Sequence, residues 1–331
     1  MDFLTRLLEH IRNRPPESTE SEQINHAPTE PLTEYVSKEL PAGHVLHGYR
    51  IEETLSTGSS TITYLAEEVS TGRRVILKEH TPFSSWYRKS DTLDVVFMER
   101  SENDDALRKN FLHAAYLQST LDHPNIAKVY SIFFTHNTAY CALEFMEGYL
   151  LPDFVEQLRN RGKSIPEELL VEWIANTLKI LEYLHQHELL HLAITPDNIL
   201  TDSNGKTALI GFSNMSEGFK TPQIISFNYG FSPDEQDYGS SENMGPWTDL
   251  YSLGATLYYT LTGNLLPSSS ERKIFDPITP LGENPLLTAK YNEQILRSID
   301  RAISPAIEDR YQNAGEWTAA RSTRVEVRIE E

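Results

Sequence analysis

The sequence predicts an α+β protein with a β-rich lobe followed by a mainly helical lobe. Between residues 49 and 145, apolar runs typical of β-strands surround one helical segment, whereas beyond residue 151 the apolar residues recur at helical spacing. The chain has 331 residues, of which 39% are hydrophobic and 23% charged, as in globular proteins. This length suits one two-lobed domain.

The N-terminal segment differs in composition from the rest. Residues 1–14 predict a short amphipathic helix, and residues 15–43, rich in Pro, Glu, Ser and Thr without periodicity, predict a disordered linker. A helix of about three turns is too short to be stable alone in water, so we expect it to dock on a protein partner, on the rest of the chain or on a membrane surface. The alternative is a frayed end that binds nothing.

Ordered elements are expected from about residue 44. The β-rich lobe is predicted to hold a helix near 104–121 and five strands, at 49–55, 61–69, 75–80, 126–134 and 139–145. The helical lobe is predicted to contain helices at 167–187, 247–263, 290–303 and 313–321.

Charge and cysteine content exclude several classes of function. The net charge of −19 argues against a nucleic-acid partner, which would need a basic surface. The single cysteine, Cys141, lies in an apolar run and predicts a buried thiol in a reducing compartment. No apolar stretch is long enough to span a bilayer, and the N-terminus lacks a signal-peptide pattern, so we expect a cytoplasmic protein.

A series of motifs follows one order along the chain. These are LSTGSSTITYLA, VILK, DHPNIAKVY, ALEFMEG, HLAITPDNIL, ALIGFS, FSPDEQ, WTDLYSLGATLYYTLTG and EDRYQNAGEW. In this order they resemble a bacterial-type (Hanks-type) serine/threonine protein kinase domain over residues 44–322. The resemblance implies a protein-kinase-like fold with a five-stranded antiparallel N-lobe (44–146), a mainly helical C-lobe (147–322) and a tail (323–331).

The chain departs from the family pattern where phosphoryl transfer needs specific side chains. The proton-accepting carboxylate of the catalytic loop is replaced by Ala193, and the metal-binding carboxylate by Gly211, which has no ligand atom. Ala114 stands where a glutamate should pair with the phosphate-holding lysine, and Thr195 replaces the loop lysine. Asp197 as an alternative base, and Glu99 or Glu102 as an alternative helix glutamate, are less favoured by their positions.

Other family positions are retained. The resemblance implies that ATP or ADP, without magnesium and not as a required cofactor, would contact Lys78, Gly58, Leu143, Glu144, Met146 and Asn198. Lys78 could instead be solvated or paired with another acid, and Asn198 could simply hydrogen-bond the backbone. No metal site is expected, because His185, His187 and His191 lack an acid or thiol to complete a ligand set.

Residues with structural roles in the family are also present. They are His191, Phe212, Glu235, Asp249 and Arg310. Asp249 is expected to hold the catalytic-loop backbone, Glu235 and Arg310 to form a buried ion pair, and Phe212 to stack with His191.

This combination predicts a catalytically inactive pseudokinase that acts as a scaffold or allosteric partner of another protein, such as an active kinase or an effector. One alternative is a nucleotide-sensing module that needs no metal. The other is an atypical kinase-fold transferase, for example of adenylate, although Gly211 argues against it because such enzymes still need metal carboxylates. Ser216, Thr221 and Ser226 are candidate sites for phosphorylation by another kinase.

Overall fold

The computed structural model describes residues 35–322 except 83, 99–100, 219–226 and 237–242. The predicted N-terminal helix (1–14) and the tail (323–331) therefore lie outside the described residues. The chain divides into two compact units, one up to Thr120 together with Lys128–Phe145, the other made of Leu121–Ala127 and the residues from Met146 on.

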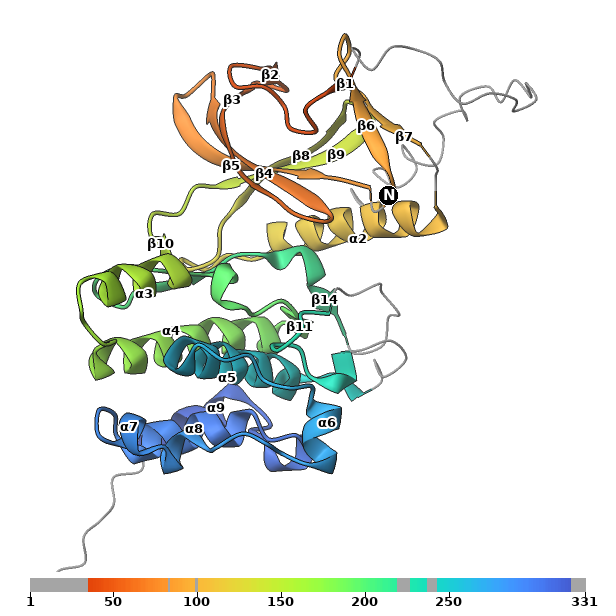
Figure 1. Cartoon of the computed structure of the whole chain (residues 1–331). Helices are drawn as coiled ribbons and strands as arrows, with labels where there is room; N and C mark the ends of the chain where they lie inside the picture. Colours follow the sequence, from red (N-terminus) through yellow and green to blue (C-terminus); the bar gives the residue numbers. More distant parts are fainter. Residues whose placement is uncertain (1–34, 83, 99–100, 219–226, 237–242, 323–331) are drawn as a thin grey trace, which may run out of the picture. The chain divides into compact units, whose positions relative to one another are not determined.

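The first unit is built on one curled antiparallel sheet (Figure 1). Its order is β2-β3-β4-β5-β9-β8, with bounds β2 Val45–Leu46, β3 Tyr49–Thr57, β4 Thr61–Glu68, β5 Arg73–His80, β8 Val129–Thr135 and β9 Thr138–Glu144. The five predicted strands are all present. The sheet has six strands rather than five, because the two-residue β2 pairs with the start of β3.

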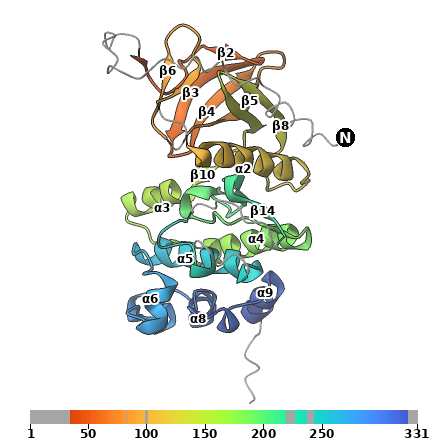
Figure 2. The ribbon, with the colours of Figure 1, turned by 90° about the vertical axis from the view of Figure 1, so that its right-hand side faces the viewer.

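One helix, α2 (Glu102–Ser119), packs beside β8 and β9 of this sheet (Figures 1 and 2). It begins with a capping box, in which the Ser101 hydroxyl accepts from Asn103 N and the Asp104 carboxylate accepts from Ser101 N. The helix therefore starts two residues earlier than predicted. Glu102 is its first residue and does not belong to the preceding loop.

A second, three-stranded sheet was not predicted. It runs β1-β6-β7, with bounds β1 Tyr35–Val36, β6 Trp86–Lys89 and β7 Val95–Phe97. The predicted disordered linker (15–43) is wrong for its last residues, because β1 pairs with β6 and Leu40 is buried, with its backbone N–H donating to Tyr64 Oη. The polar composition of the segment gave no indication that Leu40 would pack into the first unit.

A buried charge network joins the two sheets. Arg88 Nη2 donates to Glu79 Oε1 at 2.7 Å, and both side chains are fully buried. Hydroxyls of Tyr64 and Tyr140 donate to the same carboxylate at 2.7 Å, so its oxygens have several partners. Arg88 also donates to the carbonyl oxygens of Lys38 and Leu93. This many donors and acceptors is what allows two charges to be buried here.

The second unit is mainly helical. Its helices are α3 Leu151–Asn160, α4 Glu167–Gln186, α5 Pro246–Thr262, α6 Ser269–Ile274, α7 Pro285–Thr288, α8 Glu293–Ala302 and α9 Ala314–Ser322. α4 packs on α5 and α9, and α5 on α8 (Figure 2). The four predicted helices are present within a few residues of their predicted bounds, and α3, α6 and α7 are additional. Among the helices of the described residues, none is long and apolar enough to cross a bilayer.

Short strands complete the second unit around the loops of interest. One small sheet has the order β10-β12-β13, and the other pairs β11 with β14. Their bounds are β10 Tyr149–Leu150, β11 Leu189–Leu190, β12 Ile199–Thr201, β13 Thr207–Leu209 and β14 Ser216–Glu217. They fix both ends of the segment 191–198 between β11 and β12.

The first unit is expected to lose stability in mild acid. Burial, followed by the charges of the neighbouring His44 and Arg88, lowers the pKa of His136 to about 4, while the charge of Asp94 acts in the opposite direction. A base with a depressed folded-state pKa binds fewer protons than in the unfolded chain, so the free energy of unfolding falls as pH drops from about 6.5 to about 4. His136→Asn should remove about 1–2 kcal/mol of this loss, after allowance for partial exposure of the ring.

Asparagine is chosen because position 136 has a positive φ of 48°, which asparagine tolerates. The measurement is chemical unfolding of wild type and variant at several pH values between 4 and 7.5. Equal slopes of unfolding free energy against pH in both proteins would contradict the prediction.

Candidate functional site

The segment His191–Asn198 is held in place by one buried carboxylate. Asp249, near the start of α5, accepts from His191 N and from Leu192 N, each at 2.9 Å, and contacts His185 Nε2 at 2.9 Å. Burial alone would raise the pKa of Asp249, but the hydrogen bond and charge of His185, the charge of His191 and the His191 backbone bond lower it overall. The bonds also stabilise Leu192 at a positive φ of 57°, a conformation that a leucine rarely adopts.

The predicted pair of His191 and Phe212 is present. The two rings meet edge to face with centroids 4.6 Å apart, and both residues are buried. His191 Nε2 also contacts Ile210 O at 3.0 Å. This packing connects the segment 191–198 to the residues that precede and follow Gly211.

Two of the substituted positions are buried in the same segment. Ala193 is 5% exposed and presents only a methyl group, so it brings no proton acceptor on its side chain. Thr195 is buried and precedes the 3₁₀ turn Pro196–Asn198. Asp197, considered above as an alternative base, is an exposed residue of that turn.

Asn198 occupies the space beside Gly211. Gly211 has a φ of +80°, and a Cβ atom at that position would lie 2.2 Å from Asn198 Oδ1 and 2.6 Å from Asn198 Nδ2. The Asn198 amide is itself held, because Nδ2 donates to Ala193 O at 2.8 Å. The volume next to position 211 is thus filled by the neutral side chain of Asn198. Its N–H donates to the backbone, which was one of the two roles considered for Asn198 from the sequence.

Glu235 and Arg310 form the predicted ion pair. Arg310 Nη1 lies 2.5 Å from Glu235 Oε1, and the two side chains are 0% and 3% exposed. Arg310 also donates to Ser304 O and Pro305 O, and Thr248 Oγ1 donates to Glu235 Oε1. The pair fastens the 3₁₀ turn Asp234–Gln236 to the segment that precedes α9.

In the first unit, Lys78 has no acidic partner among the residues that the structure describes. It lies on β5, opposite Thr63 of β4 and Cys141 of β9, and burial lowers the pKa of its ammonium while the Cys141 thiol acts in the opposite direction. No carboxylate of the described residues lies within 4.0 Å of it, and Ala114 is buried in α2 without a charge to offer.

The other predicted nucleotide-binding residues are divided between the units. Gly58 lies in the turn between β3 and β4, where its N–H donates to Thr61 O. Leu143 and Glu144 are the last residues of β9, and the Glu144 carboxylate accepts from Lys128 N. Met146 and Asn198 belong to the second unit.

The histidines that suggested a metal are engaged separately. His185 contacts Asp249, His187 Nδ1 lies 2.7 Å from Tyr183 O, and His191 contacts Ile210 O. Among the described residues, no group of three His, Cys, Asp or Glu side chains is arranged to hold a metal ion.

Some features were missed in the sequence. Leu192 is buried and clusters with Leu190 and Met244, an apolar contact that the motif pattern did not predict. Ser216, a candidate for phosphorylation, is 1% exposed in β14, whereas Thr221 and Ser226 lie outside the described residues. The strand pattern WYRK…VVF was the available signal for the β6–β7 hairpin.

Together the two units define the protein-kinase class of fold, with a curled sheet and one helix in one unit and helices around a catalytic-loop-like segment in the other. Residues 49–294 match the family model described as "Protein kinase domain". The chain belongs to this family.

Individual relatives agree with this assignment. The chain is 29% identical over 227 residues to serine/threonine-protein kinase PknA of Nostoc, covering 65% of this chain and 37% of that protein. It is 23% identical over 280 residues to serine/threonine-protein kinase PrkC of Bacillus subtilis, covering 82% of this chain and 39% of that protein. The chain thus spans well under half the length of these relatives.

Solved structures agree on the fold. The structure titled "PpkA-294 apo form" has a TM-score of 0.73 and 28% identity, covering 86% of this chain and 99% of that one. The PknI kinase domain of Mycobacterium tuberculosis has a TM-score of 0.60 and 20% identity, covering 86% and 98%.

Adding a side chain at position 211 should destabilise the protein through Asn198. Gly211→Ala is expected to cost about 2–4 kcal/mol of unfolding free energy, from the positive φ and from displacement of the Asn198 amide. Gly218→Ala is the matched control, because Gly218 has a φ of +61° but open space around its Cβ position. Gly218→Ala should lower the unfolding free energy only by the cost of placing an alanine at a positive φ, about 1 kcal/mol.

Urea unfolding of Gly211→Ala, Gly218→Ala, Asn198→Ala and the double variant Asn198→Ala/Gly211→Ala measures this effect. The double variant should be less destabilised than the sum of its single changes, because the clash is removed. Equal costs for Gly211→Ala and Gly218→Ala would contradict the assignment of Asn198 as the obstacle.

Breaking the Glu235–Arg310 pair should be costly. Arg310→Met leaves a buried carboxylate without its charged partner, and is expected to lower the unfolding free energy by about 3–5 kcal/mol. Arg297→Met is the control, since the Arg297–Glu293 pair has a similar 2.7 Å separation but is more than half exposed, and little change is expected there. Thermal or urea unfolding compares the two, and similar losses would contradict the argument.

Proposed function

We propose that this protein is a pseudokinase, a member of the protein kinase family that acts by binding another protein rather than by transferring phosphate. The observation that carries the proposal is the contact of Asn198 with the site of the missing carboxylate at Gly211. Kinase catalysis is largely positioning and charge neutralisation by metal ions, so an absent metal ligand and an absent base together remove its main components.

The surroundings of these positions support the same interpretation. The Asn198 amide is fastened to Ala193 O, so restoring a carboxylate at position 211 would require this hydrogen bond to break. Ala193 is buried, which leaves no side-chain acceptor at the position of the base. In contrast, Asp249, the Glu235–Arg310 pair and the His191–Phe212 contact are retained. A protein that keeps the structural contacts of the fold but not the catalytic side chains suits the role of a scaffold or an allosteric regulator. We propose that its partner is an active kinase or an effector.

A second candidate function is metal-independent nucleotide sensing. It is favoured by Lys78, whose ammonium has no carboxylate within 4.0 Å among the described residues and therefore keeps its donors for a phosphate. Sensing and partner binding are compatible, because a nucleotide that binds one conformation better than another shifts the population between them.

Two measurements separate these functions from catalysis. The first is incorporation of labelled γ-phosphate into the protein itself and into a general basic substrate, with Mg²⁺ or Mn²⁺. We expect none above background. Metal-dependent incorporation that Lys78→Ala abolishes would overturn the pseudokinase proposal.

The second is thermal unfolding with ATP or ADP, with Mg²⁺ or with a chelator. Sensing predicts a saturable rise in Tm that persists in chelator and is lost in Lys78→Ala, because a ligand that binds only the folded state stabilises it. Arg74→Ala, exposed on the same strand, is the control and should keep the response. No response in any condition would remove the sensing function and leave partner binding.

A further inference from the structure

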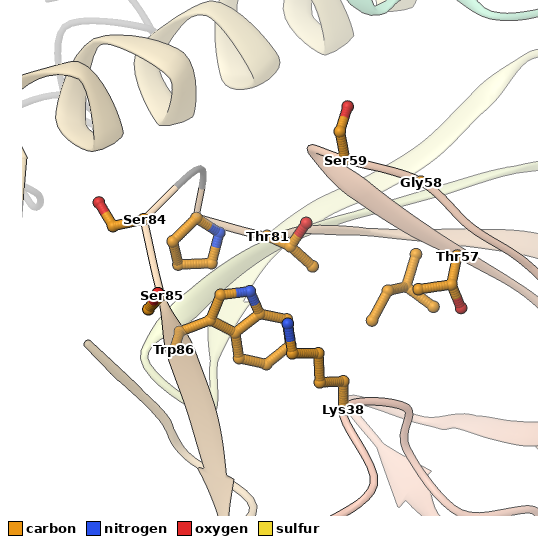
Figure 3. Close-up of a pocket in the computed structure, with 10 residues that line it drawn as sticks. Lys38, Thr57, Gly58, Ser59, Thr81, Ser84, Ser85 and Trp86 are labelled. Atoms are coloured by element: carbon orange, nitrogen blue, oxygen red, sulfur yellow. The ribbon is translucent and has the colours of Figure 1, made fainter. Parts of the chain in front are cut away.

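A cavity of about 250 Å³ lies within the first unit (Figure 3). Three stretches that are separate in sequence surround it. They are the segment 37–44 between β1 and β2, the end of β3 with the following turn and the start of β4, and the residues between the end of β5 and the start of β6. The lining residues are Lys38, Thr57, Gly58, Ser59, Ile62, Thr81, Pro82, Ser84, Ser85 and Trp86.

This cavity is on the opposite face of the sheet from Lys78. Successive side chains of a strand point to opposite faces, and the pairing places Ile62 opposite Glu79 and Thr63 opposite Lys78. Ile62 lines the cavity, so the cavity lies on the Glu79 face, which the β6–β7 hairpin also contacts through Arg88. It therefore lies on the other face of the sheet from Lys78, and Gly58, in the turn at its border, is the one predicted nucleotide-binding residue that also lines it.

The charge of the lining is positive. Lys38 carries the one formal charge among the ten residues, in a chain with a net charge of −19. Its ammonium is 5.0 Å from the centroid of the Trp86 ring, and no carboxylate of the described residues lies within 4.0 Å of it. The aromatic face positions the cation without neutralising it, so its N–H groups remain available to an anion.

Hydroxyl groups add further donors. Thr57 donates to Glu39 and Ser84 to Asp104, so these two are engaged. The hydroxyls of Ser59, Thr81 and Ser85 have no hydrogen-bond partner within the described part of the chain. Figure 3 shows Lys38 reaching toward Trp86, with the Thr81 side chain between the Ser84 and Ser59 positions.

We propose that this cavity binds a small phosphate monoester, with the phosphate at Lys38 and the free hydroxyls. An ammonium and several hydroxyl donors match the acceptor-only oxygens of a phosphate, and ionised acceptors strengthen such bonds. The volume exceeds the roughly 150 Å³ that accepts a benzene-sized molecule, which leaves room for a small organic group beside the phosphate. A bound ligand would contact the segment 37–44, the turn at Gly58 and the residues after the end of β5.

The test titrates the full chain with glycerol 3-phosphate, and separately with inorganic phosphate, against sodium chloride at the same ionic strength. The measured quantity is the Tm, supported by calorimetric titration. We expect a saturable rise with glycerol 3-phosphate that chloride does not produce. Lys38→Ala should weaken the apparent affinity at least about tenfold, and Thr81→Val, which keeps the side-chain shape, should weaken it less.

Two matched variants make the outcome specific. Lys89→Ala removes an exposed lysine on the same hairpin that does not line the cavity, and Lys78→Ala removes the cation on the other face of the sheet. Both should respond like the wild type. The proposal is overturned by an equal response of Lys38→Ala and Lys89→Ala, by loss of the response in Lys78→Ala, or by the absence of any saturable response.

Discussion

The buried carboxylate of Asp249 is the interaction on which the second unit depends most. It binds the N–H groups of His191 and Leu192 and the ring of His185, so it fixes the start of the loop whose other end is held by β12. Because these partners outweigh the cost of burial, the carboxylate keeps its charge. Asn198, which lies beside Gly211, belongs to the loop that is held at this point.

The absence of a side chain at Gly211 has a packing consequence. A space next to a glycine does not remain empty in a close-packed interior. Asn198 fills it and is held by Ala193 O. The contact beside Gly211 is therefore neutral, and it is the observation on which the proposed pseudokinase function rests.

The first unit uses charge differently. Within the described part of the chain Lys78 has no acidic partner, whereas the neighbouring residue on β5, Glu79, is held by Arg88 and two tyrosines on the other face of the sheet. The same Arg88 donates to the carbonyl oxygen of Lys38. One guanidinium therefore connects the segment 37–44, the β6–β7 hairpin and β5. These segments also border the cavity that we propose to bind a phosphate monoester. A ligand in the cavity would therefore contact the segment 37–44 directly.

The sequence by itself determined the family and the order of the β-rich and helical lobes, because these depend on local periodicity and on which residue stands at each motif position. The ion pair of Glu235 and Arg310 could be predicted for the same reason. Only the tertiary structure decided what fills the place beside Gly211, that the last linker residues join a second sheet, and that Glu79 is buried in a pair with Arg88. Each of these depends on residues distant in sequence meeting in a shared volume, and no local pattern encodes such a meeting.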